Sequence, residues 1–327
     1  MTEKTQIVQD ACRRLRALPN RTIAQYILFH HGAIFDGNLE KIRDSVRYYF
    51  GVKGNSDKEK AGKAGSLITR LSSPVMPETW RKTRTAYKLP LGLWLVINDI
   101  HIPFHEPKPL ETALKYGKDK KIDGILINGD LQDYASISFW MSSVKRDFDK
   151  EISMVLDFLD LLKKEFPKQK KVWKPGNHEY RFPRLYQAKF PDLMGLPMIA
   201  MDAVLDLEGR GIEFLDYRQI VDAGILPILH GHEIATLSRA INPARGLFLR
   251  TKSWAMCGHC HTTSEHTERN IQGTILTTWS VGCLCDLSPD YNPYGNNWNW
   301  GFALVNVEKN GNFRVENKRI LPSGKVV

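Results

Sequence analysis

Five clusters of residues that can bind metal ions stand directly after short apolar runs of the chain. They are Asp99 with His101 after LWLVIN, Asp130 after ILING, Gly176–Glu179 (GNHE) after VWKP, His230 after ILPIL, and Gly258–His261 (GHCH) after SWAMC. With His232, two positions after His230, six of the ten histidines lie in or next to these clusters, so chance placement is a poor explanation. Short apolar runs favour buried strands, and a layered α/β enzyme carries its reactive groups beyond the ends of its strands. The pattern therefore predicts an α/β fold whose strand ends meet at one site.

Strands and helices are predicted to alternate from residue 91 onwards. Leu93–Ile97 and Ile125–Ile127 have the continuous apolar character of buried strands, and a helix is expected to begin near Pro109. Arg146–Phe166 has the apolar spacing of a long amphipathic helix, and a short strand should precede Pro175. This order is typical of a layered α/β fold.

The C-terminal segment from Gly301 to Leu321 is predicted to form a β-hairpin. Apolar residues on both sides flank Asn310-Gly311. This dipeptide has a strong preference for the tight turn of a hairpin.

Three short helices are predicted in the first 50 residues. Thr5–Leu18 has apolar or small residues at helical spacing, Thr22 can cap a second helix that Gly32 ends, and Asn38–Phe50 is again amphipathic. Three short helices with a basic last helix resemble a helix-turn-helix module, whose last helix would lie against a nucleic-acid groove. The alternative is a helical cap on the enzyme or a dimerisation element.

The excess positive charge lies almost entirely in the first 90 residues. This segment has 17 Lys and Arg against 8 Asp and Glu, which accounts for +9 of the net charge of +10. Such a segment is the electrostatic footprint of a nucleic-acid-binding region, because neutralised phosphates release condensed counterions. We therefore expect nucleic acid as a partner of the basic residues 1–90; the alternative is a solvated basic surface.

The composition changes between residues 51 and 90, where Gly, Ser, Lys and Pro are dense and the apolar periodicity fades. These are the properties of a linker. We therefore predict a helical domain over residues 1–52, a basic linker over 53–90 and a catalytic domain over 91–327.

The chain has the composition of a soluble protein. No apolar stretch approaches the roughly 18 residues of a spanning helix, and the N-terminus lacks an apolar signal core. We therefore expect a cytoplasmic protein without a membrane partner. Five cysteines without a secretory signal argue against a disulfide framework. Cys257, Cys260, Cys283 and Cys285 could form a zinc site, but small buried residues beside a hydrolytic site are the preferred interpretation.

The five clusters, in this order, resemble the motifs of the calcineurin-like metallophosphoesterase superfamily. That pattern is Asp-x-His, Gly-Asp, Gly-Asn-His-Glu or Asp, a lone His, and Gly-His-x-His, and the match extends from about residue 91 to about residue 310. The resemblance implies two mixed β-sheets flanked by helices, with two metal ions at one end, here preceded by a small all-α domain. It also implies a metal-dependent phosphoesterase.

The resemblance further implies a role for each residue of the clusters. Asp99, His101 and His261 would hold one ion, Asn177, His230 and His259 the other, and Asp130 would bridge both. A shared anionic ligand offsets the repulsion between two cations. Mixed imidazole and oxygen ligands suit Mn, Fe, Zn or Ni better than Ca, so we expect two divalent ions, with manganese first. A hydroxide that bridges the ions would be the nucleophile.

Residues beside the ligands are also assigned from the resemblance. His178 matches the residue that protonates the leaving oxygen, so we expect it to be the general acid. Asp133 matches a carboxylate that orients His178 or a metal-bound histidine. Arg181 is a candidate phosphate clamp, with a surface salt bridge as the alternative. His232 is expected to support the ligands or the structure, and His105 either faces the substrate or caps a turn.

Three functions compete at this level. We favour hydrolysis of a phosphodiester in nucleic acid, as in the repair-nuclease branch or in phage-type members with a helical N-terminal domain. The second is hydrolysis of nucleotides or other small phosphate esters. The third, a non-catalytic nucleic-acid-binding protein, is disfavoured by the complete ligand set.

Two segments bear on the substrate. Leu131–Tyr134 stands where phosphoprotein phosphatases have Val-Asp-Arg-Gly, so the phosphate-binding Arg of that branch is absent. Asp286–Trp300 is rich in Tyr, Trp and Asn. Such a segment can stack on bases or sugars, or it can be an ordinary loop whose tryptophans pack on the sheet edge.

Overall fold

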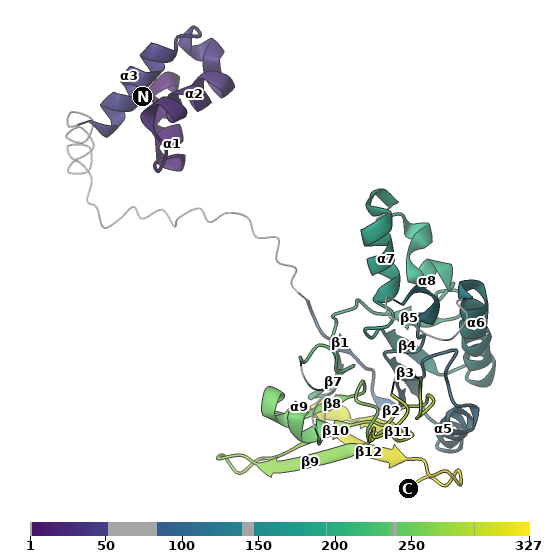
Figure 1. Cartoon of the computed structure of the whole chain (residues 1–327). Coiled ribbons are helices and arrows are strands. Elements are labelled where there is room, and N and C mark those ends of the chain that lie inside the picture. The colour runs from purple at the N-terminus through teal and green to yellow at the C-terminus, as the bar shows by residue number, and fades with distance from the viewer. Residues whose placement is uncertain are drawn as a thin grey trace. The chain divides into compact units, whose positions relative to one another are not determined.

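The chain divides into two compact units. The computed structural model describes residues 2–51, 84–138, 147–193, 195–235, 237, 241–290 and 292–327. The units are Met1–Arg81 and Lys82–Val327, and each is considered by itself (Figure 1). Most of the segment expected to be the linker therefore lies outside the described residues. No helix in the described ranges combines the length and the apolar character needed to cross a membrane.

The described part of the first unit, residues 2–51, contains three α-helices around a small core. Its elements are α1 (Glu3–Arg14), α2 (Asn20–His31), the 3-10 helix η1 (Gly32–Phe35) and α3 (Leu39–Phe50). Its buried side chains are Val8, Ala11, Cys12, Ile23, Ala24, Ile27, Phe35, Ile42 and Val46. All three helices contribute to this set, which confirms that each apolar stripe faces a shared interior.

The ends of these helices confirm part of the sequence prediction and correct the rest. Asn38 caps α3 by accepting a 3.1 Å hydrogen bond from the amide of Lys41, and Gly32 ends α2, as expected. Thr22 is not a cap, because Pro19 holds that position and its carbonyl accepts the amide hydrogen bond of Thr22. The helix α1 ends at Arg14, short of the predicted end at Leu18.

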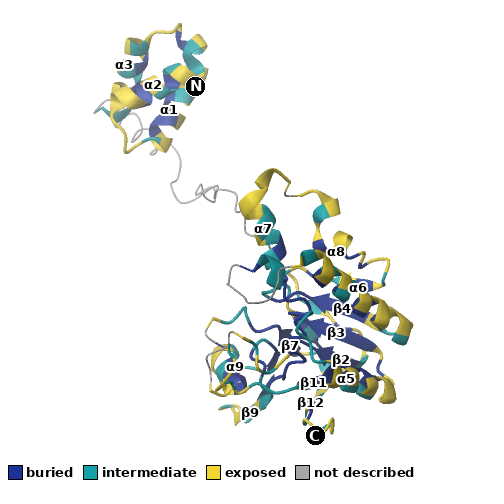
Figure 2. Ribbon diagram, turned by 45° about the vertical axis from the view of Figure 1, so that its right-hand side comes forward, coloured by how far each residue is buried: buried dark blue, intermediate teal, exposed yellow. Residues whose placement is uncertain are grey.

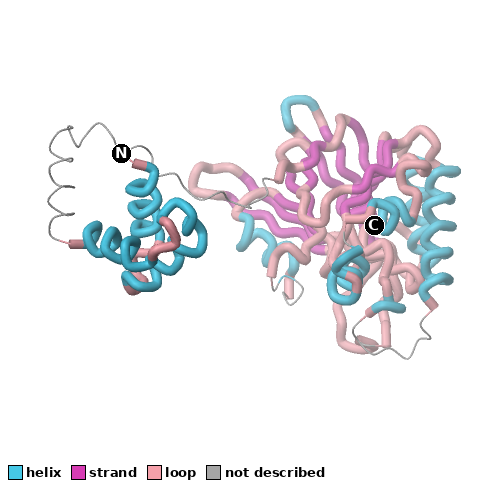
Figure 3. Tube along the Cα trace, turned by 90° about the horizontal axis from the view of Figure 1, so that it is seen from above, coloured by secondary structure: helices cyan, strands magenta, loops and turns pink. Residues whose placement is uncertain are grey.

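The second unit contains two mixed sheets of six strands each within the described residues. One sheet has the order β1 (Tyr87–Lys88), β6 (Val221–Ala223), β7 (Leu226–Leu229), β8 (Ala255–Cys257), β10 (Ile275–Ser280), β9 (Ser264–Arg269). The other has the order β12 (Phe313–Arg319), β11 (Gly301–Val307), β2 (Gly92–Ile97), β3 (Gly124–Asn128), β4 (Lys170–Lys174), β5 (Ile212–Phe214). Seen from above, the strands lie inside this unit and helices lie along its outside (Figure 3). The predicted fold class is thus confirmed.

Helices flank the sheets of the second unit. They are α5 (Pro107–Asp119), α6 (Phe148–Glu165), α7 (Arg181–Lys189), α8 (Met201–Val204) and α9 (Pro243–Thr251), with the 3-10 helices η2 (Ala135–Ile137), η3 (Pro191–Leu193), η4 (Pro197–Ile199) and η6 (Lys309–Gly311). Helices α5 and α6 lie against the sheet that contains β2, β3 and β4, and their outer surfaces are exposed (Figure 2).

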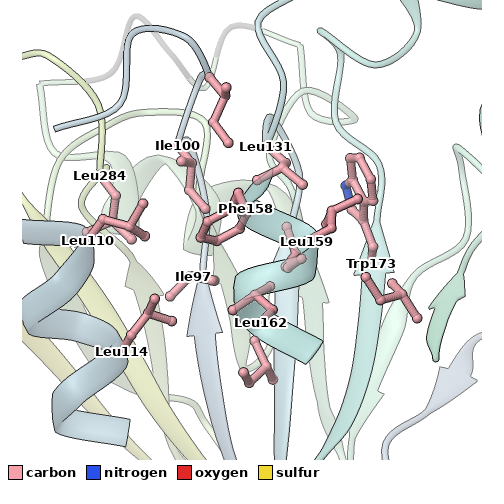
Figure 4. Packing of buried hydrophobic residues seen from close by; sticks show 14 of the residues in the cluster. Ile97, Ile100, Leu110, Leu114, Leu131, Phe158, Leu159, Leu162, Trp173 and Leu284 are labelled. Atoms are coloured by element: carbon pink, nitrogen blue, oxygen red, sulfur yellow. The ribbon is translucent and has the colours of Figure 1, made fainter. Parts of the chain in front are cut away.

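The alternation of side chains along β2 explains how the layers are held together. Ile97 points toward the helices, where it packs with Leu114 of α5 and Leu162 of α6 (Figure 4). Trp94 and Val96 point to the opposite face, where they belong to the core between the two sheets. Because both faces are buried, the strand is a continuous apolar run, as the sequence predicts.

Other elements agree with the sequence except at their boundaries. The hairpin forms as predicted, since β11 and β12 pair antiparallel and Asn310 and Gly311 both have left-handed φ angles, 63° and 82°. The long helix is α6, although Arg146, its predicted first residue, lies outside the described residues. Tyr87 and Lys88 fall within the predicted linker, yet they form β1, which pairs with β6 of the second unit. A two-residue strand has too little periodicity to be read from the sequence.

Candidate metal centre

All seven predicted metal ligands follow strands of the second unit. Asp99 and His101 follow β2, Asp130 follows β3, Asn177 follows β4, His230 follows β7, and His259 and His261 follow β8. The neighbouring pairs β2–β3, β3–β4 and β7–β8 are parallel, so within each sheet these loops leave from the same edge. The site is therefore built from both sheets.

The ring and carboxylate atoms of these residues converge. His230 Nε2 lies 3.1 Å from Asp130 Oδ2, and His261 Nε2 lies 3.3 Å from Asp99 Oδ1. The Nε2 atoms of His101 and His261 are 3.2 Å apart. The structure thus brings residues that are as far as 160 positions apart in the sequence into contact.

Three groups of close metal-binding atoms occur within the described residues. They are His101 with Asp130 and His178, Asp130 with His230 and His259, and His101 with His261 and Cys285. Asp130 belongs to two of these groups. A carboxylate that offsets the repulsion between two cations would need this shared position. The division of the seven residues between two ions remains a prediction.

The atoms that would face a cation lack other partners. Asp99 Oδ1, Asn177 Oδ1 and His230 Nε2 are buried and accept or donate no hydrogen bond. His230 Nδ1 lies 2.8 Å from the carbonyl of Asn128, which places the proton on Nδ1 and a lone pair on Nε2. His101 Nδ1 faces Asp133 Oδ2 at 3.0 Å, which likewise places the proton on Nδ1 and a lone pair on Nε2. Nitrogen and oxygen lone pairs directed at one another fit divalent cations.

The backbone at the site adopts conformations that side chains usually avoid. Asp99, His101, Asp130, His259 and His261 all have φ angles between 51° and 65°. Each such residue costs on the order of 1–3 kcal/mol, and clusters of them are typical of functional sites. The loops also approach closely, because a Cβ atom on Gly176 would lie 2.2 Å from Asp130 Oδ1. The packing of the surrounding structure therefore holds these side chains in place against the cost of the strained backbone.

The three predicted catalytic residues form one hydrogen-bonded cluster. His178 Nδ1 lies 3.0 Å from the carbonyl oxygen and 3.2 Å from Oδ2 of Asp133, whose other carboxylate oxygen accepts from Arg181 at 3.2 Å. His178 Nε2 faces Asp130 Oδ2 at 3.9 Å. Burial alone would lower the pKa of His178, but the charges of Asp130 and Asp133 outweigh it and raise that pKa. Asp133 therefore lies within hydrogen-bond distance of both His178 and Arg181.

Glu179 is a structural residue of the site that the sequence interpretation did not assign. Its buried carboxylate accepts hydrogen bonds from the amides of Gly176 at 2.7 Å, Asp130 at 3.0 Å and Gln132 at 3.1 Å. Burial, with the charge of Asp130, raises its pKa to about 7. Its place in the GNHE cluster was the only signal, because a motif does not show which amides donate to a carboxylate.

A buried ion pair between Lys174 and Glu233 was also missed. Lys174, at the end of β4, is fully buried and bonds to Glu233 Oε1. Glu233 Oε2 accepts the amide of Gly231 at 2.7 Å, next to His230. Burial alone would raise the pKa of Glu233, but the charge of Lys174 lowers it to about 2. The pair therefore joins the loop of Asn177 in one sheet to the loop of His230 in the other.

His232, His105 and Cys285 lie close to the ligands. The His232 ring lies 5.3 Å from that of His230, outside the three groups, which agrees with a supporting role. The backbone of His105 pairs with that of Cys285, whose Sγ lies 3.9 Å from His261 Nδ1. Cys257, Cys260, Cys283 and Cys285 are buried and free, and Cys12 is buried in the first unit. No group of close metal-binding atoms in the described ranges contains more than one thiol, so the four-thiolate zinc site is not formed there.

The two tryptophans of the late aromatic segment differ in their surroundings. Trp300 packs against the main core and donates from Nε1 to the carbonyl of Cys285 at 2.9 Å. Trp298 instead lies on His261, with 4.1 Å between the ring centroids. Tyr291 of this segment lies outside the described residues.

The chain is similar to known proteins in sequence and in fold. The family model for calcineurin-like phosphoesterase matches residues 94–259. The Gene 54 protein of Mycobacterium phage L5 is 28% identical over 229 residues, which is 65% of this chain and 88% of the phage protein. Among solved structures, Yfce, a phosphoesterase from E. coli, is 11% identical, with a TM-score of 0.35 over 72% of this chain and 96% of its own. A dimetal phosphatase from Danio rerio is 10% identical, with a TM-score of 0.36 over 70% and 96%.

Proposed function

This chain belongs to the calcineurin-like phosphoesterase family and is a metal-dependent phosphoesterase, and we propose that it cleaves a phosphodiester bond in nucleic acid at a pair of divalent ions. The position of Asp130 in two groups of metal-binding atoms carries the proposal of two ions. When bound, the ions would supply Lewis acidity toward the phosphoryl oxygens and toward the attacking water.

The residues of the chain would position the substrate and supply a proton. The charges of Asp130 and Asp133 raise the pKa of His178, which favours the protonated ring that can give its proton to the leaving oxygen. Asp133 holds the ring by its Nδ1 side, which leaves Nε2 directed toward Asp130 and the reacting phosphate. Arg181 Nη2 lies 3.4 Å from His178 Nε2, close enough to bind a phosphoryl oxygen beside it.

His178→Ala is expected to lower turnover of a phosphodiester by about 10²–10⁴-fold, because a positioned general acid contributes that much. Bound manganese, measured by calorimetry, should be retained. The assay compares linear, circular and single-stranded DNA with a chromogenic phosphodiester and monoester. His266→Ala is the matched control, since His266 lies on β9 and pairs with the exposed Glu268. Unchanged activity in His178→Ala would overturn the general acid, and activity confined to small esters would favour the second candidate function.

Nucleic acid as the substrate is supported by charge in the first unit. Two of the three basic residues of α3 are offset locally, since Arg43 pairs with Glu40 and Arg47 pairs with Asp44. Arg14 at the end of α1, Arg16 in the connection and Arg21 in the first turn of α2 are exposed and form no ion pair within residues 2–51. These three arginines are therefore better placed to contact phosphates than α3, the helix that the helix-turn-helix interpretation favours.

Replacing Arg14, Arg16 and Arg21 together with Gln is expected to weaken duplex DNA binding by the full-length protein and to flatten its salt dependence. Each lost phosphate contact should reduce the slope of log K against log salt by about 0.9. The slope is measured by fluorescence anisotropy over a salt series. The control replaces Lys120, Lys164 and Lys168, which are exposed on the second unit, with Gln. If both triple variants weaken DNA binding equally, binding depends on the total positive charge and not on Arg14, Arg16 and Arg21.

A further inference from the structure

Trp298 lies over the proposed metal centre in a way that the ligand set does not explain. Its indole centroid is 4.1 Å from that of His261, and the ring planes make an angle of 61°. The side chain of His261 is only 7% exposed, whereas Trp298 is partly exposed. The half-buried Trp298 therefore lies directly beside a residue that faces Asp99.

The loop that carries Trp298 is tied to the loop of His261 on both sides of the indole. The amide of Asn299 donates to the carbonyl of His261 at 2.9 Å. Thr262 Oγ1 donates to the carbonyl of Asn297 at 3.0 Å. The amide of Trp298 donates to Asn296 Oδ1 at 3.1 Å. These bonds hold the backbone of Trp298 beside His261, so less of the loop has to be ordered when a ligand binds against it.

We propose that Trp298 forms a stacking subsite for an aromatic base attached to the phosphate that is cleaved. This inference rests on the proposed function and names the part of the substrate that the site recognises. The indole contacts His261, a proposed metal ligand, so a base stacked on it would lie beside a phosphate held at that ligand. Every base has a flat π-face, so such a platform would accept different bases without reading their edges.

The test measures binding of two phosphonates that the protein cannot hydrolyse as esters. Manganese-loaded full-length protein is titrated with thymidine 5′-methylenephosphonate, which carries a base, and with methylphosphonate, which does not. Trp298→Leu is expected to weaken binding of the first by about 10-fold and to leave the second unchanged, because only the base would stack. Trp298→Phe should recover most of the affinity, since it restores an aromatic face.

The matched control is Tyr294→Leu, which removes an aromatic ring that is 89% exposed on the same loop and should change neither affinity. The manganese affinity of every variant is measured without phosphonate. Equal loss for both phosphonates, or a lower manganese affinity in Trp298→Leu, would mean that the indole only covers His261, and the subsite would be rejected. Because binding is measured without turnover, failure of the subsite is distinguishable from failure of the proposed hydrolysis.

Discussion

Lys174→Met is expected to lower the free energy of unfolding of the second unit by about 3–5 kcal/mol, the usual cost of removing one partner from a buried ion pair. Lys174 is fully buried, and its loss leaves the carboxylate of Glu233 without its cation. The measurement is urea unfolding of the full-length protein near pH 7. Manganese affinity should fall as well, because Glu233 holds the amides next to His230.

The control for this prediction is Lys171→Met on the same strand. Lys171 is also buried, but its Nζ donates only to the carbonyl of Gln169, so the expected cost is below about 1 kcal/mol. The double variant Lys174→Met/Glu233→Gln should recover part of the lost stability, since no buried charge is then left unpaired. If the two single Lys variants are equally stable, the ion pair does not hold the loops together.

The cost of Lys174→Met should also depend on pH. The folded-state pKa of Glu233 is lowered to about 2 from the ordinary 4.5, so the pair stabilises the fold above pH 4.5. That stabilisation is lost as the pH falls through 2, because the carboxylate becomes neutral. The difference in stability between the wild-type protein and the variant should therefore shrink between pH 4.5 and pH 2.

Asp130→Asn is expected to lower phosphodiester turnover by at least about 10³-fold, because several kcal/mol of charge stabilisation depend on the ions. The carboxylate lies 3.1 Å from His230 Nε2 and 3.9 Å from the Nε2 atoms of His101 and His178. A neutral amide there cannot offset the repulsion between two cations. In the wild-type protein, manganese at 100 times its dissociation constant should add about 2.7 kcal/mol of stability, and the variant should lose most of this.

Turnover, metal stoichiometry and the manganese-induced rise in melting temperature are measured together. The fold of the variant should persist, because the new amide oxygen can still accept the 2.9 Å hydrogen bond from the amide of His178. Asp157→Asn, at an exposed position of α6, is the matched control and should behave like the wild-type protein. If the variant still binds two manganese ions and turns over normally, Asp130 is not the ligand that the two ions share.

The predictions that the structure confirms depend on residues close together in the sequence. The run Leu93–Ile97 is a strand buried on both faces, and Asn310-Gly311 forms the hairpin turn between its two strands. Periodicity and turn preference are local properties, so they are visible before the chain folds. Helix ends were less accurate, as Thr22 and Leu18 illustrate, because the residue that caps a helix is chosen by the path of the preceding chain.

The sequence by itself determined which side chains could serve a metal centre and that they would follow strands. The tertiary structure alone decided what supports them. Lys174 and Glu233 are 59 positions apart, and Trp298 is 37 positions from His261, so neither contact follows from a motif. Such contacts arise from the order of strands in two sheets and from the energy of burying both sheets against each other. That energy also maintains the left-handed backbone of Asp99 and Asp130, which no short segment would adopt alone.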